Sequence, residues 1–293
     1  MDLSVIIVNY NTKDLIINCI RSIYDQTGQV DYEIIVVDNA SIDGSVAAIK
    51  NKFPNVILLE SPENLGFGKA NNLAARTAKG EFLFFLNSDT LLLNNAIKIF
   101  YDAYYALGDR TGCIGTILWN TNHEPIHSFG IFPTCGQVIG GNIRGRYLKI
   151  QEKAFNIDSC TFPLAVDYIT GADLFVSASL FKSVGQFDES FFMYFEETDL
   201  QKRITKLGLN NRMIDEAHIV HLAGGSFRKQ ARLSNESTMM IERSMFHYLK
   251  KHNASLIGYL LFRFGYLLVR IPHLFNFRYA IKDQLKYLNF LMK

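Results

Sequence analysis

The sequence predicts an α/β fold built on a mostly parallel sheet. Apolar, β-branched runs alternate with segments of helical periodicity through the first 90 residues, and three of those runs end in polar residues. The expected strands are 3–8, 33–37, 56–60 and 82–86, and the expected helices are 14–24, 45–51 and 68–78. Such βαβ alternation places helices on both faces of the sheet, and ligands bind outside the carboxyl ends of its strands.

The next part of the chain is less regular. Residues 112–165 are rich in Gly, Pro, Asn and Thr, which predicts hairpins and long loops rather than another βαβ unit. Residues 166–176 read as one strand and 180–184 as a short turn or helix. We expect these segments to form the side of a cleft at which an acceptor substrate would bind.

Composition excludes several classes of protein. The chain has 293 residues, of which 48% are hydrophobic, so it can bury one large core or two small ones. Its net charge is +2, and no basic stripe with interleaved aromatic residues occurs in the first 240 residues, so we expect no nucleic-acid partner. The four cysteines are far apart and form no CxxC pair, which favours reduced thiols. The N-terminus lacks a basic segment and a cleavage site, which indicates a protein that is not exported.

Polar residues follow three of the expected strands: Asn9–Asn11, Asp38–Asn39 and Asn87–Asp89. One such exit is more often a turn, but three together favour a site. No GxGxxG follows the first strand and no P-loop is present, so the phosphates of a bound nucleotide would need side chains and a metal. Asp89 offers a hard oxygen ligand for Mg²⁺ or Mn²⁺, or alternatively caps a helix that starts near Asn94.

A cluster of acids follows an aromatic run in SFFMYFEETDL, residues 190–200. The segment after Phe195 reads as a helix with Leu200, Ile204 and Leu207 on one stripe. On a helical wheel Glu196 and Glu197 both flank this stripe, so helical spacing does not show which of the two has a functional role. Asp199 points elsewhere and is expected to be a favourable acid near the helix N-terminus, pairing with Lys202 or Arg203.

Seven blocks in order carry a resemblance to a known family. They are VIIVNYN (5–11), VVDNASIDGS (36–45), ENLGFGKANN (63–72), FLFFLNSDT (82–90), TGADLFV (170–176), VGQFDESFFMYFEETDLQKR (184–203) and HLAGGS (221–226). Together they resemble inverting family 2 glycosyltransferases of the GT-A fold, in the bacterial rhamnosyltransferase-like branch. The resemblance covers about residues 3–230 and implies a mixed, mostly parallel sheet. It places a GT-A domain at 1–240, with a nucleotide-sugar half at about 1–112 and an acceptor half at about 113–240.

The resemblance also implies nucleotide-sugar-binding residues. Asp38 would contact the nucleotide base, accepting the imide N–H of thymine or uracil. Tyr10 and Asn11 would line the same pocket, and Asn71 lies in the block that closes over the nucleotide and sugar. Ser88, beside the metal-binding acid, belongs to the same group.

The resemblance assigns the metal and the catalytic base as well. Asp89 and His221 would hold Mn²⁺ or Mg²⁺ together with diphosphate oxygens, although Asn87 stands where the family's first Asp would be. His218 is rejected as a ligand. The general base is the second acid of the family's pair, which maps to Glu197, with Phe191–Phe195 as aromatic walls. Glu196 and Tyr194 are expected to orient donor or acceptor hydroxyls.

The implied substrates follow from the same branch. dTDP-rhamnose is the favoured donor, and a UDP-sugar remains open. The implied acceptor is a lipid-linked glycan of a growing cell-surface polysaccharide such as an O-antigen. The implied location is the cytoplasmic face of the bacterial membrane, where the protein would be peripheral. A homodimer is possible. Two other classes stay as alternatives: a catalytically silent module that binds nucleotide sugars or glycans, and a metal-dependent phosphoesterase.

Residues 241–293 form an extension of different composition. From Phe246 onward the chain carries a net charge of +7, against about −5 for the remainder. Over 256–271 an apolar helical face opposes a face of tyrosines and arginines, and the helix is expected to stop at Pro272. It is shorter than a membrane span and contains two arginines, so we expect it to lie on a membrane surface. The alternative is a helix packed on the catalytic domain or a second subunit with its arginines at the surface.

Overall fold

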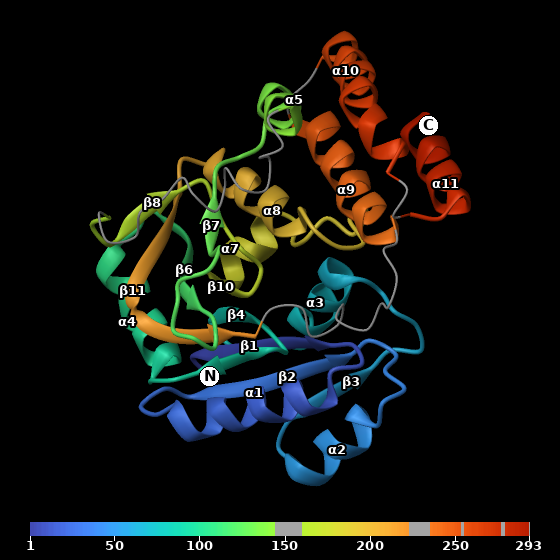
Figure 1. Ribbon diagram of the computed structural model, residues 1–293. Helices are drawn as coiled ribbons and strands as arrows, with labels where there is room; N and C mark the ends of the chain where they lie inside the picture. The colour runs from blue at the N-terminus through green and yellow to red at the C-terminus, as the bar shows by residue number, and fades with distance from the viewer. Residues whose placement is uncertain (144–159, 223–234, 253–254, 277–278, 293) are drawn as a thin grey trace. The chain divides into compact units, whose positions relative to one another are not determined.

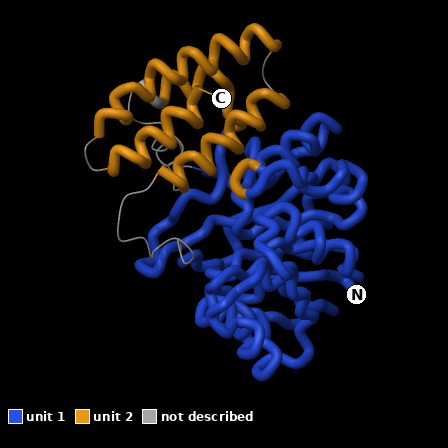
Figure 2. Tube along the Cα trace, turned by 90° about the vertical axis from the view of Figure 1, so that its right-hand side faces the viewer, with its two compact units in different colours: residues 1–131, 156–192, 196–228 blue, residues 132–155, 193–195, 229–293 orange. Residues whose placement is uncertain are grey.

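The computed structural model describes residues 1–143, 160–222, 235–252, 255–276 and 279–292 (Figure 1). The chain divides into two compact units (Figure 2). The first takes its described residues from 1–131, 156–192 and 196–228, and the second from 132–155, 193–195 and 229–293.

The first unit holds all the described strands. Its elements, in chain order, are β1 (Leu3–Asn9), α1 (Lys13–Gln26), β2 (Tyr32–Asp38), α2 (Ser45–Lys52), β3 (Ile57–Glu60), α3 (Phe67–Ala75), β4 (Phe82–Asn87), β5 (Thr90–Leu92), α4 (Ala96–Leu107), β6 (Thr111–Trp119), β7 (Phe129–Gly130), β8 (Leu164–Val166), β9 (Tyr168–Ile169), β10 (Asp173–Ser177), α7 (Ala178–Ser183), α8 (Glu196–Thr205) and β11 (Asn210–His221). The second unit contains α5 (Cys135–Ile143), α9 (Glu236–His252), α10 (Leu256–Leu274) and α11 (Ile281–Met292).

The main sheet is mixed and mostly parallel, as the sequence resemblance implied. Its strand order is β3-β2-β1-β4-β10-β6-β11-β5, and β8 pairs with β11 outside this path. Strands β1 to β4 are parallel, as are β6 and β11, whereas β10 runs antiparallel to both of its neighbours. The parallel strands are buried on both faces, which is why they read as continuous apolar runs.

The register of the parallel strands places their polar exits at one edge. Asn9 of β1 pairs with Asp38 of β2, and Val8 pairs with Asn87 of β4. The three exits therefore end within one residue of the same level. Helix α1 packs Ile16, Ile20 and neighbouring side chains into the main core beneath these strands (Figure 1).

The prediction of loops over 112–165 was wrong at its start, because 111–119 form the buried central strand β6. Two glycines in this strand admit side chains from neighbouring elements. A Cβ at Gly112 would lie 2.7 Å from Ile204 Cγ2, and one at Gly115 would lie 2.3 Å from Ile169 Cγ2. Here glycine marks a close approach to the backbone rather than a turn.

Other expected elements also differ. Residues 166–176 are not one strand, since a turn at 170–172 separates β9 from β10. Helix α8 ends at Thr205, so Leu207, expected on its buried stripe, is 61% exposed, whereas Leu200 and Ile204 are buried. Residues 90–92 form β5 and the next helix begins at Ala96, so Asp89 does not cap that helix.

The central helix of the second unit directs its polar side toward the other helices of that unit. In α10 the tyrosine and arginine side faces the other helices of the unit, and the apolar side is exposed. The alternative placed the arginines at the surface, and on this point it is wrong, because Arg263 and Arg270 are engaged inside the unit. The helix also continues through Pro272 to Leu274 instead of stopping there. Among the helices that the structure describes, none combines the length and the apolar character needed to cross a bilayer.

Candidate active site

A chain of side-chain hydrogen bonds joins the polar exits of three strands in the first unit. Asn9 Nδ2 donates to Asp38 Oδ2 at 2.8 Å, and Thr12 Oγ1 donates to Asn9 Oδ1 at 2.7 Å. Thr12 Oγ1 also lies 3.0 Å from Ser88 Oγ. Asn9 and Thr12 thus couple Asp38 to Ser88, a role that their sequence positions did not single out. The available signal was the polar character of the β1 exit itself.

The loop after β2 closes around the same carboxylate. Ser41 N donates to Asp38 Oδ1 at 2.9 Å, and Asn11 N donates to Ser41 Oγ at 2.9 Å. Asn11 and Ala40 both adopt left-handed backbone conformations, with φ of 54° and 67°. Asp38 is buried and both of its oxygens accept hydrogen bonds from the protein, whereas Tyr10 is 40% exposed at the rim.

Strand pairing brings the two expected metal ligands together. His221, the last residue of β11, pairs with Thr90 of β5, directly after Asp89. His221 Nε2 consequently lies 3.1 Å from Asp89 Oδ1 and 3.4 Å from Asn87 Nδ2. His218, by contrast, is exposed and stacks beside Trp119 at 6.5 Å between ring centroids. The rejection of His218 as a partner in this cluster agrees with that position.

The ligand atoms of Asp89 and His221 suit a divalent cation whose other ligands come from a bound substrate. In an octahedral site with metal–ligand distances of about 2.1 Å, neighbouring ligand atoms are about 3 Å apart, and the imidazole and carboxylate atoms are 3.1 Å apart. In the part of the chain that the structure describes, no three His, Cys, Asp or Glu side chains form a metal-binding group. Asp89 and His221 therefore fit two positions, and oxygen ligands from a diphosphate would have to fill the others. Ala223–Ser226 of the HLAGGS motif lie outside the described residues.

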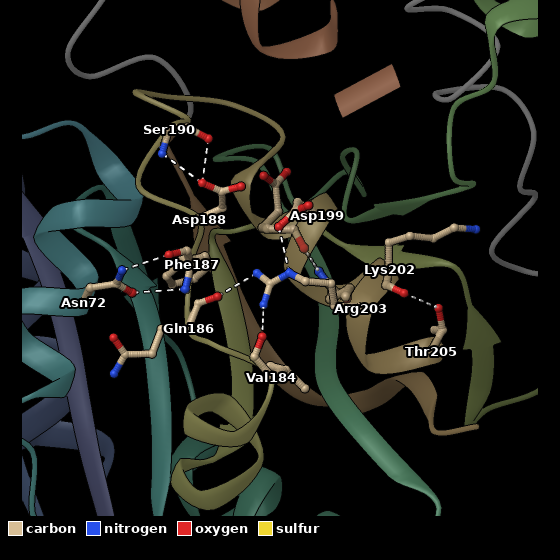
Figure 3. Close-up of polar contacts among 12 residues, drawn as sticks. Asn72, Val184, Gln186, Phe187, Asp188, Ser190, Asp199, Lys202, Arg203 and Thr205 are labelled. Carbon is tan, nitrogen blue, oxygen red and sulfur yellow. Dashed lines mark hydrogen bonds and ion pairs between the residues drawn. The ribbon is translucent and has the colours of Figure 1, made fainter. Parts of the chain in front are cut away.

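Helix α3 places two adjacent asparagines differently. Asn71 is buried, and its Nδ2 donates to the Phe67 carbonyl one turn earlier at 3.1 Å. Asn72 instead anchors a distant loop, donating to the Phe187 carbonyl at 2.9 Å and accepting from Phe187 N at 3.1 Å (Figure 3). Sequence reasoning selected Asn71 and missed Asn72, because helical spacing alone does not show what each side chain meets.

Arg203 holds the other side of this loop (Figure 3). Its Nη2 donates to the Gln186 carbonyl at 2.6 Å, and its Nη1 donates to the Val184 carbonyl. Its Nε donates at 2.9 Å to Asp199 Oδ2, and Asp199 is fully buried. The expected Asp199–Arg203 pair is thus confirmed, and it fixes residues 184–186 shortly before the acidic motif.

The two glutamates at the start of α8 occupy different environments. Glu196 is 4% exposed and packs against Gly68 of α3, where an added Cβ would lie 3.5 Å from Glu196 Cβ. Burial, reinforced by the charge of neighbouring Glu197, raises the pKa of Glu196 well above its ordinary value. Glu197 is partly exposed, and its Cβ would lie 3.7 Å from a Cβ added to Gly171. The structure therefore distinguishes two acids that the helical wheel could not.

The aromatic run before these acids is divided between the two units. Phe191 is buried in the first unit, and Phe192, 44% exposed, accepts a 2.8 Å hydrogen bond at its carbonyl from Phe67 N. Gly66, with φ of +79°, passes so close to this carbonyl that a Cβ there would lie 2.1 Å from its oxygen. Tyr194 belongs to the second unit and has a left-handed φ of 70°.

Comparison with known proteins identifies the family. The family model described as "Glycosyl transferase family 2" matches residues 4–165, more than half of the chain. The chain belongs to glycosyl transferase family 2. The resemblance to this family that was drawn from the motifs is thereby confirmed.

Curated relatives of this family 2 glycosyltransferase include enzymes of several specificities. A poly(ribitol-phosphate) beta-glucosyltransferase from Bacillus spizizenii is 38% identical over 107 residues, 35% of this chain and 17% of that protein. An N-acetylglucosaminyl-diphospho-decaprenol L-rhamnosyltransferase from Mycobacterium tuberculosis is 27% identical over 209 residues, 64% of this chain and 66% of that protein. Rhamnosyltransferase WbbL from Escherichia coli is 26% identical over 168 residues, 54% of this chain and 61% of that protein. The chain thus spans less than two thirds of each relative.

Solved structures confirm the GT-A fold of this family 2 glycosyltransferase. A mannosyltransferase from Pyrobaculum calidifontis, in complex with GDP-Man and Mn²⁺, superposes with a TM-score of 0.58 at 17% identity, covering 99% of this chain and 72% of that one. TarS from S. aureus gives a TM-score of 0.57 at 16% identity, covering 99% of this chain and 48% of that one. At these identities the likeness concerns the fold alone.

Proposed function

We propose that this glycosyltransferase moves L-rhamnose from dTDP-rhamnose, with inversion, to a hydroxyl of a growing lipid-linked polysaccharide of the cell surface. The observation that carries the proposal is the cluster of Asp89, Asn87 and His221 at the same sheet edge as the hydrogen-bonded Asp38. Two relatives are rhamnosyltransferases, which supports rhamnose, and the name of one of them includes a polyprenyl diphosphate, N-acetylglucosaminyl-diphospho-decaprenol. A UDP-sugar is the competing donor, since another relative is a glucosyltransferase and TarS has been solved with UDP.

Asp38, Tyr10 and Asn11 would form the base pocket, with Ser88 and Asn71 toward the phosphates and sugar. Asp38 already accepts two hydrogen bonds, but its two carboxylate oxygens offer about four lone-pair sites. An imide N–H can therefore be added without displacing Asn9 or Ser41.

Asp89 and His221 would hold a Mn²⁺ or Mg²⁺ ion, which supplies positive charge opposite the departing diphosphate when it is bound. Mn²⁺ accompanies a nucleotide sugar in the mannosyltransferase of the same fold. The residues of this chain orient that site: Asn87 contacts the imidazole, and the Leu222 N–H donates to the Asp89 carbonyl at 2.9 Å.

Glu197 is proposed as the general base that removes the proton of the acceptor hydroxyl. Burial raises the pKa of the Glu196 carboxyl and favours its protonated form, which leaves Glu197 as the acid of the pair that can accept a proton. A protonated Glu196 can donate a hydrogen bond, which suits an orienting role toward a sugar hydroxyl. Tyr194 is kept as a second orienting residue.

The cellular setting belongs to the same proposal. The enzyme would work on the cytoplasmic face of the bacterial membrane, as a peripheral protein, with residues 1–240 as the catalytic domain and 241–293 as the membrane-associated extension. A homodimer remains a prediction that light scattering on the full chain would test.

Calorimetry with dTDP, UDP and GDP, each with and without Mn²⁺, tests the donor assignment. Tighter binding of dTDP that depends on Mn²⁺ supports a rhamnosyltransferase. Preference for UDP would replace rhamnose by another sugar. If none of the three nucleotides binds, a catalytically silent module becomes the better description.

A further inference from the structure

Helix α10 exposes an uninterrupted apolar row. The outer row, as we call it, consists of Ile257, Leu260, Leu261, Phe264, Leu268 and Ile271. These side chains are 41–72% exposed and fall within one sector of the helical wheel. No charged or hydrogen-bonding side chain interrupts that sector. A water-facing helix surface normally carries polar residues, so this row requires a partner.

The polar side of the same helix is turned inward and fully engaged. Arg270 donates to Glu242 of α9 through Nη2, and through Nε to Tyr287 Oη of α11 at 2.6 Å. Arg263 places its guanidinium 4.2 Å from the Phe246 ring centroid and donates to the Leu291 carbonyl at 2.8 Å. These contacts hold α10 in one rotation about its axis. The helix therefore cannot turn its arginines outward without breaking a buried ion pair.

Helix α11 adds apolar surface in the same unit. Ile281, Leu285 and Met292 are 62–80% exposed and lie along one side of that helix. Exposed lysines occur in the same unit: Lys282 and Lys286 on α11, of which Lys286 pairs with Glu236, and Lys250 at the end of α9. The only acid after residue 246 is Asp283. The surface thus combines aliphatic and aromatic side chains with positive charge.

Two properties select a lipid bilayer over a second copy of the chain. Protein interfaces make about one hydrogen bond per 100–200 Å², and the outer row offers no polar group for one. A symmetric dimer through this surface would also bring the same lysines toward their own copies, whereas anionic headgroups complement them. An interfacial helix requires only an apolar face to enter the headgroup–acyl boundary and cations beside it.

We infer that the outer row of α10 inserts into the surface of an anionic bilayer, with the helix lying in the membrane plane. This inference rests on the proposed function only for its membrane location, and it is independent of donor and acceptor identity. It refines the sequence-based prediction of a helix on the membrane surface, because Arg263 and Arg270 are engaged within the unit and do not face the lipid headgroups. Lys250 and Lys282 supply the electrostatic part.

Co-sedimentation of the full chain with vesicles tests this assignment. Vesicles of phosphatidylcholine mixed with phosphatidylglycerol should retain the wild-type protein more strongly than vesicles of phosphatidylcholine alone. Leu261→Ser should weaken binding at least about threefold, and Leu261→Ser/Phe264→Ser about tenfold or more. Leu207→Ser is the matched control, since Leu207 is 61% exposed in the first unit, and it should bind as the wild type does.

Thermal unfolding, calorimetric nucleotide binding and the oligomeric state separate the possible outcomes. Unfolding and nucleotide binding should be the same in all variants, because the substituted side chains are exposed and those of α10 lie outside the first unit. Undiminished vesicle binding by the double variant would overturn the inference. The inference would also be overturned if the wild type does not bind vesicles and instead forms a dimer that the double variant disrupts. If the wild type binds vesicles but no nucleotide, the donor proposal fails and the membrane surface stands.

Discussion

His221 Nε2 lies 3.1 Å from Asp89 Oδ1, although 132 residues separate them in the chain. The antiparallel pairing of β5 with β11 produces this contact, since His221 sits opposite Thr90. A carboxylate and an imidazole at this spacing can act as neighbouring ligands of one divalent cation. The cluster therefore depends on β5 and β11, at the far edge of the sheet, as much as on the exit of β4.

Replacing this histidine should weaken metal-dependent nucleotide binding. For His221→Gln we expect the affinity for nucleotide in the presence of Mn²⁺ to fall by about tenfold or more, because even residues that only support a metal ligand contribute 10–100-fold. Binding without Mn²⁺ should change little. The measurement is calorimetry with and without the metal. His218→Gln, on the same strand but exposed beside Trp119, should retain wild-type binding; equal losses in both variants would argue against the assignment.

Neutralising the proposed base should separate chemistry from binding. In Glu197→Gln we expect the rate of sugar transfer to fall by about 100- to 10,000-fold, since a general base contributes that range. Nucleotide affinity should be unchanged. Transfer from the donor that calorimetry identifies provides the assay, and Glu216→Gln, an exposed acid on β11, provides the control. Near-normal turnover by Glu197→Gln would show that another group is the base.

The buried pair of Asp199 and Arg203 should matter for stability. Arg203→Gln leaves a fully buried carboxylate without its ion-pair partner and frees two loop carbonyls, so we expect the free energy of unfolding to fall by about 3 kcal/mol. Lys98→Gln removes another i,i+4 pair, with the exposed Asp102, and should change stability by less than about 1 kcal/mol. Urea unfolding of both variants makes the comparison. A small effect at Arg203 would mean that the loop is held by other contacts.

In the helical unit, Glu242 should contribute far more than a neighbouring acid on the same helix. Glu242 accepts from Tyr266, Tyr287 and Arg270, which joins α9 to α10 and α11. Glu242→Gln should destabilise this unit by about 2 kcal/mol or more, because it leaves the buried Arg270 cation unpaired. Glu236→Gln breaks an exposed pair with Lys286 and should have little effect. Hydrogen exchange within α9–α11 distinguishes the two.

Glu196 should make stability depend on pH. Burial raises the pKa of this carboxyl in the folded protein above that of the unfolded chain, so the folded state binds the extra proton. Its contribution is most favourable below the unfolded pKa of about 4.3 and is lost as pH rises toward the folded pKa. Unfolding of wild type and Glu196→Gln between pH 4 and 8 should therefore diverge in favour of Gln at high pH. Glu60→Gln, at an exposed site, should track the wild type at every pH.

The sequence determined the alternation of strands and helices in the first 90 residues and the polar exits of three strands. Parallel strands that are buried on both faces must be apolar throughout, so β1, β2 and β4 can be recognised in the sequence as continuous apolar runs. The family motifs singled out Asp89, His221 and the glutamate pair. Strand β6 was missed because its glycines, which accommodate Ile204 and Ile169, look like turn residues in isolation.

Only the tertiary structure decided which side of each helix is covered. Helical periodicity shows that α10 has an apolar and a polar side, but partners from α9 and α11 turned its arginines inward. Likewise, Glu196 and Glu197 flank the same stripe, and the packing of α3 at Gly68 buried one of them. The physical reason is common to both cases: the burial of a polar group depends on which side chains and backbone from distant parts of the chain pack against it, and local spacing contains no information about them.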